Sequence, residues 1–161
     1  MRILALDQAS RVSGWAIFDG DTLEQYGKID VSKYFELGER LHVIRQEVEH
    51  LIDDEHIDAV VLEDIYMDGQ RVNNVQTFKA LAEVFGVLYE LCVDMEKPVE
   101  AVLAGTWKST LGIKGKTRPE QKRNAQEWVV NNYGVKPTQD ECDAICIGAH
   151  KVRGMVNDWG E

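Results

Sequence analysis

Four carboxylates, far apart in the chain, occupy positions that indicate metal-dependent chemistry. Asp7 and Glu63 each end an apolar run that is typical of a buried strand, and Asp140 and Asp143 lie three residues apart in a helical stretch. Two like charges ~4 Å apart repel by about 4 kcal/mol at an effective dielectric of 20. A cluster of these acids would therefore need protons or cations. Oxygen-only ligands suit Mg²⁺ or Mn²⁺, and both metals serve phosphate chemistry.

Each acid also has an ordinary structural explanation when it is taken alone. Asp7 is followed by serines and suits a turn cap, and Glu63 suits an exposed strand end. Asp140 and Asp143 lie in the first turns of a helix, where the helix dipole favours acids. Glu141 follows Thr138 at the spacing of a capping box and is expected to cap rather than to bind metal. The joint pattern is more specific than any one member.

Composition predicts one domain of ordinary size without a membrane segment. The chain has 161 residues, of which 44% are hydrophobic, and it contains no run of 18 apolar residues. We expect a single domain over residues 1–154 and a C-terminal tail over 155–161. The start lacks the pattern of a secretory signal, and the three cysteines form no CxxC pair. A reducing, cytoplasmic setting fits these features.

Charge is segregated along the chain. The net charge of −10 argues at first against a nucleic-acid partner. Residues 107–123, however, contain six basic residues and one acid, a local charge of +5, whereas the remainder has 12 basic and 27 acidic residues, or −15. A basic surface for DNA can therefore coexist with an acidic body, although a solvated basic loop would have the same composition.

Hydrophobic periodicity predicts an α/β fold with a mixed five-stranded sheet flanked by helices. The predicted strands span residues 2–7, 13–18, 22–30, 58–63 and 99–103. The predicted helices span residues 36–55, 73–95, 117–133 and 139–153. The first three strands form a meander, and a helical crossover makes the fourth strand parallel to the first. We expect the sheet order 3-2-1-4-5, which brings Asp7 beside Glu63.

Four segments, in order over roughly residues 1–150, carry a resemblance to a known family. The chain resembles RuvC-type Holliday junction resolvases at residues 3–16 (strand, turn, strand), 60–67 (second acidic strand), 107–115 (basic turn) and 140–147 (closing Asp-x-x-Asp-Ala helix). The small size and acidic balance look like those of phage-encoded relatives. The resemblance implies an RNase H-like fold and a setting in the bacterial cytoplasm or an infected host cell.

The resemblance also implies a homodimer that cleaves four-way junctions and other branched DNA. It implies that Asp7, Glu63, Asp140 and Asp143 are catalytic metal ligands. Two Mg²⁺ ions per site, with Mn²⁺ as a substitute, would flank the scissile phosphate ~3.5–4 Å apart. We expect Asp7 to bridge both ions, Glu63 to hold one, and the last two acids to complete the other.

An aromatic and several basic residues are expected to contact DNA. Tyr66 occupies the place of a family aromatic near the junction centre, where base stacking would contribute ~1–3 kcal/mol, although a rim tyrosine would look the same. Lys108 matches a basic position near the active site and is a catalytic candidate. The remaining candidates for binding backbone phosphates are Lys114, Lys116, Arg118, Lys122 and Arg123. No base-reading residue can be assigned, so we expect structure-selective cleavage with little sequence demand.

Three other functions compete with junction cleavage. An RNA–DNA hybrid nuclease would share the fold, and a non-catalytic junction-binding module would share the basic surface. An actin-like phosphotransferase would need two lobes, for which 161 residues are too few. The helix predicted over 73–95, with Phe78 and Phe85, is the candidate dimer interface, in competition with ordinary core packing on the sheet.

Overall fold

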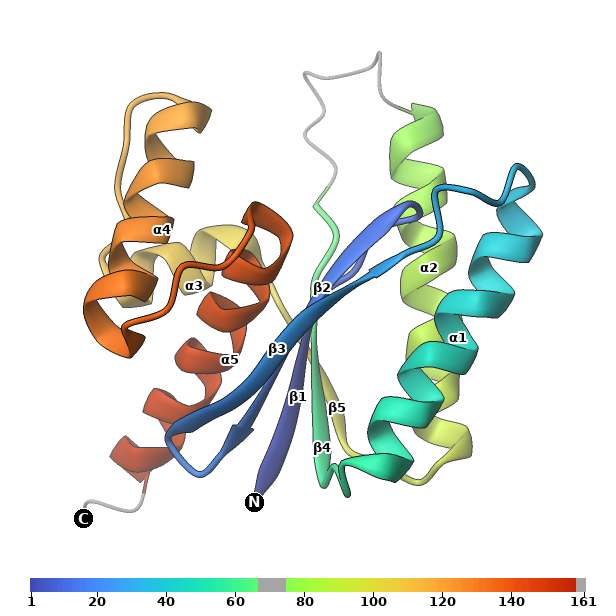
Figure 1. Cartoon of the computed structure of the whole chain (residues 1–161), viewed down its shortest axis with the longest axis horizontal. Coiled ribbons are helices and arrows are strands. Elements are labelled where there is room, and N and C mark those ends of the chain that lie inside the picture. The colour runs from blue at the N-terminus through green and yellow to red at the C-terminus, as the bar shows by residue number, and fades with distance from the viewer. Residues whose placement is uncertain (67–74, 159–161) are drawn as a thin grey trace.

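A single mixed sheet stands between two layers of helices in this protein (Figure 1). The computed structural model describes residues 1–66 and 75–158, with side chains through Met155. The elements in chain order are β1 (Arg2–Asp7), β2 (Val12–Asp19), β3 (Thr22–Asp30), α1 (Leu37–Asp54), β4 (Ala59–Glu63), α2 (Val75–Asp94), β5 (Val99–Val102), α3 (Ala104–Leu111), α4 (Arg118–Tyr133) and α5 (Gln139–Asp158).

The sheet has the order β3-β2-β1-β4-β5, as the sequence predicted. β1 pairs antiparallel with β2 and parallel with β4, where Leu6 lies opposite Leu62. β1 and β4 are covered on both faces, which explains their continuous apolar runs. Within the described part of the chain, no helix is long and apolar enough to cross a membrane.

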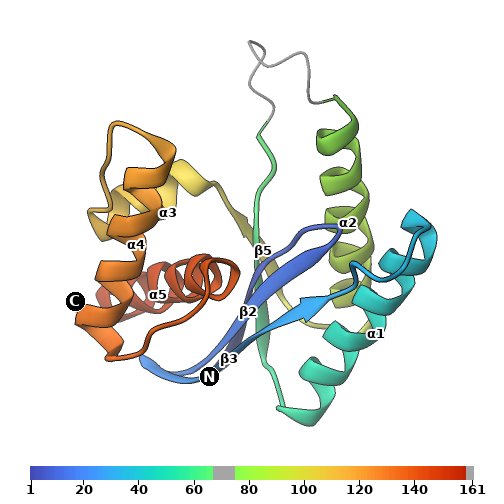
Figure 2. The ribbon, with the colours of Figure 1, turned by 45° about the horizontal axis from the view of Figure 1, so that its top comes forward.

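Alternating side chains of the central strands build two separate cores. Leu4 and Leu6 of β1 pack with α1 and α2, whereas Ile3 and Ala5 pack with α3, α4 and α5. Figure 2 shows α3, α4 and α5 together on one side of the sheet and α1 with α2 on the other. Asp7 continues the alternation of Ile3 and Ala5, so it belongs to the face that α5 covers.

The structure extends one predicted helix and adds another. Residues 104–111, which overlap the predicted basic turn, form α3, and α5 continues to Asp158 instead of ending at residue 153. α3 was missed because it is short and contains a glycine and three hydroxyl-bearing residues, which weaken the local helical signal. Burial of Trp107 and Leu111, one turn apart, stabilises it. Residues 73–74 of the predicted second helix lie outside the described residues.

The contact between α5 and the sheet depends on a helix residue without a side chain. A Cβ atom at Gly148 would lie 2.3 Å from Cε2 of Phe18 and 3.2 Å from Cβ of Ala5, and both neighbours are fully buried in the sheet. α5 can therefore lie close to β1 and β2 only because position 148 is glycine.

We predict that Gly148→Ala lowers the free energy of unfolding by about 1–3 kcal/mol, because the buried Phe18 ring cannot move away freely. Urea denaturation followed by circular dichroism would measure the change. Gly154→Ala on the same helix is the matched control, since a Cβ there meets nothing within 4 Å and should stabilise the helix by up to ~1 kcal/mol. Equal stability of the two variants would contradict the prediction.

Candidate active site

Two of the four predicted acids are brought together by the parallel pairing of β1 with β4. Leu6 lies opposite Leu62, so Asp7 and Glu63 follow at adjacent strand ends. Side chains alternate along a strand, and the two leucines belong to the core beneath α1 and α2. Asp7 and Glu63 therefore face the opposite side, toward α5.

The other two acids lie in the first two turns of α5, which packs over β2. Gly14 pairs with Asp7 across the β1–β2 ladder. A Cβ atom at Gly14 would fall 1.8 Å from the main-chain oxygen of Asp140. The start of α5 thus touches the residue beside Asp7, and Asp143 follows on the same helix face as Asp140. Glu141 does not share this role, because its carboxylate accepts a hydrogen bond from the Thr138 amide at 2.7 Å, as expected for a cap.

The pKa values show that the acids interact. Burial raises the pKa of Asp7 well above its usual range, and repulsion from Glu63, Asp143 and Asp140 raises it further. Burial raises the pKa of Glu63 as well. The pKa of Asp143 rises to about 6, mainly through burial, against the opposing effect of Lys108. The site therefore favours either bound protons or a compensating positive charge.

The donor chemistry fits a hard divalent cation, because carboxylate oxygens are the ligands that Mg²⁺ and Mn²⁺ prefer. Among residues 1–66 and 75–158, however, no three Asp, Glu, His or Cys side chains converge closely enough to hold one ion. The four acids are neighbours without being drawn together to ligand distances. Their assignment as metal ligands stays a prediction.

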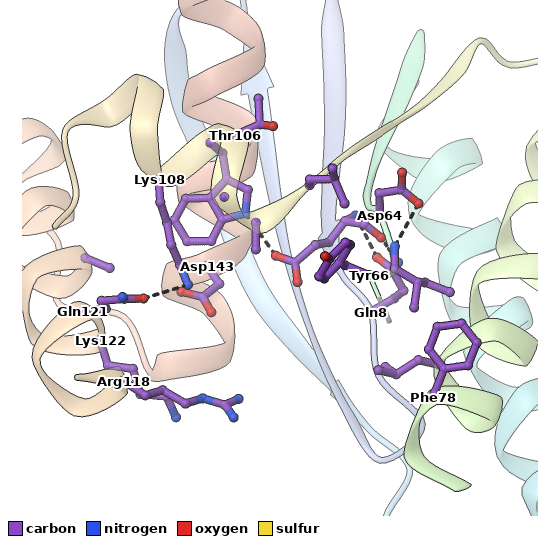
Figure 3. A pocket seen from close by; sticks show the side chains of 18 of the residues that line it. Gln8, Asp64, Tyr66, Phe78, Thr106, Lys108, Arg118, Gln121, Lys122 and Asp143 are labelled. Carbon is purple, nitrogen blue, oxygen red and sulfur yellow. Dashed lines mark hydrogen bonds between the residues drawn. The ribbon is translucent and has the colours of Figure 1, made fainter. Parts of the chain in front are cut away.

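A cleft of about 970 Å³ opens beside Glu63 and Asp143. Figure 3 shows the side chains of Lys108, Arg118 and Lys122 on the wall that carries Asp143. Lys108 donates a hydrogen bond to Gln121 of α4 at 3.3 Å, which links α3 to α4 at this wall. The wall supplies positive charge next to the acids.

The remaining basic candidates are distributed around this cleft. Lys116 lines it, whereas Lys114 lines a neighbouring hollow of about 420 Å³ that also reaches Lys108. Arg123 is exposed on α4, outside the cleft lining. The structure therefore brings four of the six basic candidates to the main cleft, places Lys114 at the neighbouring hollow, and leaves Arg123 outside both linings.

Tyr66 lies on the opposite wall of the cleft, where Figure 3 shows it on the same side as Phe78 of α2. Its side chain is 76% exposed, so it is not a core residue. An exposed aromatic ring that faces a basic wall suits stacking on a base.

Two residues that the sequence did not single out hold Glu63 in place. The side-chain Nε2 of Gln8 donates a hydrogen bond to the main-chain oxygen of Glu63 at 2.5 Å, and the side-chain Oε1 of Gln8 accepts one from the main-chain N–H of Glu63 at 3.1 Å. The buried Trp107 indole donates to Oε2 of Glu63 at 3.0 Å. In the sequence, Gln8 is a polar residue directly after Asp7, and Trp107 directly precedes Lys108. Neither position indicates that the side chain bonds to Glu63.

Comparison with known proteins identifies the family of this chain. The family model described as crossover junction endodeoxyribonuclease RuvC matches residues 3–150. The chain belongs to the RuvC family. A relative of that description from Synechocystis sp. is 30% identical over 99% of this chain and 95% of its own length. Another, from Magnetococcus marinus, is 24% identical over 91% of this chain and 81% of its own.

Solved structures share the RuvC fold. Thermus thermophilus RuvC in complex with a Holliday junction substrate superimposes with a TM-score of 0.74, at 14% identity over 97% of this chain and 96% of the other. The Fowlpox virus resolvase in complex with Holliday junction DNA gives a TM-score of 0.64, at 14% identity over 97% and 99% of the two chains. The RNase H-like fold that the sequence predicted is confirmed.

The raised pKa of Asp143 predicts how stability depends on pH. The folded protein holds this proton more tightly than the unfolded chain, so the resulting stabilisation is complete below pH 3.8 and is lost as the pH rises through about 6. This shift corresponds to on the order of 3 kcal/mol. In urea unfolding without metal, the free energy of unfolding of wild type should therefore fall between pH 3.8 and about 6, relative to that of Asp143→Asn.

The control for this measurement is Asp53→Asn, which changes an exposed acid on α1. It should follow the wild-type pH profile. A constant difference between wild type and Asp143→Asn from about pH 4 to pH 7 would contradict the assigned cause, which is loss of a proton from the buried carboxyl group.

Proposed function

We propose that this protein is a structure-selective endonuclease that hydrolyses phosphodiester bonds in four-way (Holliday) junctions and other branched DNA. The observation that carries the proposal is that Asp7 lies within electrostatic range of Glu63, Asp140 and Asp143, and that Glu63 and Asp143 line a basic cleft. Membership of the RuvC family and the junction complexes of related structures support it. A single nuclease domain over residues 1–154 is part of the proposal.

The family implies a divalent metal, and Mg²⁺ is the ion that we propose, with two per site and Mn²⁺ as a substitute. Asp7 would bridge the two ions, Glu63 would hold one, and Asp140 with Asp143 would hold the other. Such ions generate the water nucleophile and stabilise charge on the leaving oxygen. The products would carry a 5′ phosphate and a 3′ hydroxyl group.

The protein's own residues orient the DNA around these acids. Lys108 would hold the scissile phosphate or offset its developing charge, because its ammonium group lowers the pKa of Asp143 and therefore lies within electrostatic range of the acids. Lys116, Arg118 and Lys122 would bind flanking phosphates without reading sequence. Lys114 and Arg123 would extend this surface beyond the cleft. The exposed Tyr66 would stack on an unpaired base at the junction centre.

Two symmetric nicks require two sites, and we propose that a homodimer supplies them. α2 buries Val84, Leu88 and Leu91 against the sheet, so one face of this helix serves the core. Phe85 packs against this core and Phe78 is half-buried, whereas Tyr89 and Val93 remain 45% and 61% exposed. The outer face of α2 is therefore the candidate dimer surface.

Asp7→Asn tests the proposed chemistry. We predict that cleavage of a synthetic mobile junction falls by about 10³-fold or more, since metal-ion stabilisation of the transition state is worth several kcal/mol. Junction binding should persist or tighten, because the substitution removes a negative charge near the phosphates. Single-turnover cleavage in Mg²⁺ and gel-shift titration would measure the two quantities.

The same assay distinguishes the competing functions. Asp21→Asn, at the exposed β2–β3 hairpin, is the control and should cut normally. Junctions of several sequences, a linear duplex and an RNA–DNA hybrid should be compared. Cleavage confined to one sequence would overturn structure selectivity, preference for the hybrid would favour the alternative nuclease, and wild-type cutting by Asp7→Asn would end the metal assignment.

Val93→Glu tests the dimer surface. Burial of an unpaired carboxylate costs several kcal/mol, so self-association should weaken by about 100-fold or more. Sedimentation velocity would detect the monomer, and a supercoiled cruciform plasmid would be nicked once instead of linearised. Phe35→Glu, at a residue that is 89% exposed outside α2, is the control and should remain dimeric. A dimeric Val93→Glu variant would place the interface elsewhere.

A further inference from the structure

Trp107 makes two contacts that converge on the proposed active site. Its indole N–H donates to Oε2 of Glu63 at 3.0 Å. The Nζ atom of Lys108 lies 5.3 Å from the centroid of its ring, within the range of a cation–π interaction. One side chain thus touches both the carboxylate that would hold a metal ion and the cation that would hold the phosphate.

The surroundings of Trp107 make these contacts rigid. Its side chain is fully buried in the core formed by α3, α4, α5 and the sheet. Glu63 is fixed from the other side, because both main-chain polar groups of this residue bond to the Gln8 side chain. The main chain of Glu63 is therefore held by the residue that directly follows β1, and its carboxylate is held by a residue of α3.

The contact also leaves one carboxylate oxygen of Glu63 available. Trp107 donates to Oε2, and across residues 1–66 and 75–158 the Oε1 atom accepts no hydrogen bond. A hydrogen bond to one oxygen of a ligating carboxylate fixes its orientation, and such outer partners commonly affect metal affinity by about 10–100-fold. The geometry is that of a supporting residue behind a metal ligand.

We propose that Trp107 is a positioning residue that orients the Glu63 carboxylate for the divalent ion and supports Lys108 beside it. This inference rests on the proposed function, because it needs Glu63 to bind metal. Trp107 itself touches neither metal nor DNA in this role. It acts through its indole N–H and through its ring face, and the two contributions can be separated by substitution.

The first experiment compares Trp107→Phe, Trp107→Leu and Trp128→Phe. Phenylalanine removes the N–H donor but keeps an aromatic face for Lys108, whereas leucine removes both. Trp128 is a matched control, since it packs against the same core and its ring lies beneath Arg153 at 4.7 Å. Urea unfolding would verify that each variant is folded before use.

Cleavage of a mobile junction would be measured at saturating DNA over a range of Mg²⁺ concentrations. For Trp107→Phe, the Mg²⁺ concentration that gives half-maximal rate should rise about 10–100-fold, junction affinity should not change, and high Mg²⁺ should restore the rate. Trp107→Leu should retain a reduced rate at high Mg²⁺, because Lys108 has also lost its support. Trp128→Phe should match wild type. A Mg²⁺ dependence of Trp107→Phe equal to that of Trp128→Phe would overturn the proposal.

The second experiment measures no catalysis. Mg²⁺ is titrated into protein that retains Trp107. The indole N–H resonance of Trp107 in ¹⁵N-labelled protein is identified by its absence from Trp107→Phe. Glu63→Gln should move this resonance, and addition of Mg²⁺ without DNA should shift it in wild type. A resonance that responds to neither change would overturn the proposal.

The outcome for Asp7→Asn separates failure of this inference from failure of the proposed function. If Asp7→Asn is inactive while Trp107→Phe behaves as wild type, only the positioning role is wrong. If Asp7→Asn cuts at the normal rate, the metal site is wrong and the role of Trp107 falls with it.

Discussion

Asp7, Glu63, Asp140 and Asp143 repel one another, because like charges interact strongly in a poorly solvated site. Forces that do not involve charge hold them near one another. Parallel pairing fixes Asp7 beside Glu63, and close packing at Gly14 and Gly148 holds α5 against the sheet. The raised pKa of Asp7 records the electrostatic cost of this arrangement. Folding thus prepares a site whose remaining repulsion a cation would relieve.

The basic wall and the acidic body have complementary effects on DNA. Lys108, Lys122 and Arg118 each lower the pKa of Asp143, so they lie within electrostatic range of the acids. Outside residues 107–123 the chain carries a net charge of −15. A polyanion is therefore attracted to one region and repelled by most of the remaining surface. Such segregation favours one orientation of bound DNA, with its backbone close to the acids.

α3 connects this basic wall to the metal-binding candidates. Two neighbouring residues of this short helix make the contacts. The Trp107 indole donates a hydrogen bond to Glu63, and the Lys108 ammonium group lies over the indole ring. Gly112, at φ 71°, ends the helix in the left-handed region, and Thr117 then caps α4. Both helices bury side chains in the core between α5 and the sheet, which holds them against the sheet. The candidate phosphate-binding and metal-binding groups consequently share one support.

The sequence by itself determined the order of the strands and of every described helix except α3, the parallel pairing of the first and fourth strands, and the family. These properties follow from local periodicity and short motifs. It also predicted that Asp7 and Glu63 lie side by side, because each ends an apolar run and the two runs are adjacent parallel strands. Tertiary structure alone decided that residues 104–111 are helical and that Trp107 meets Glu63, 44 residues away in the chain. Such contacts depend on how helices dock on the sheet, and docking is set by packing that no local pattern encodes.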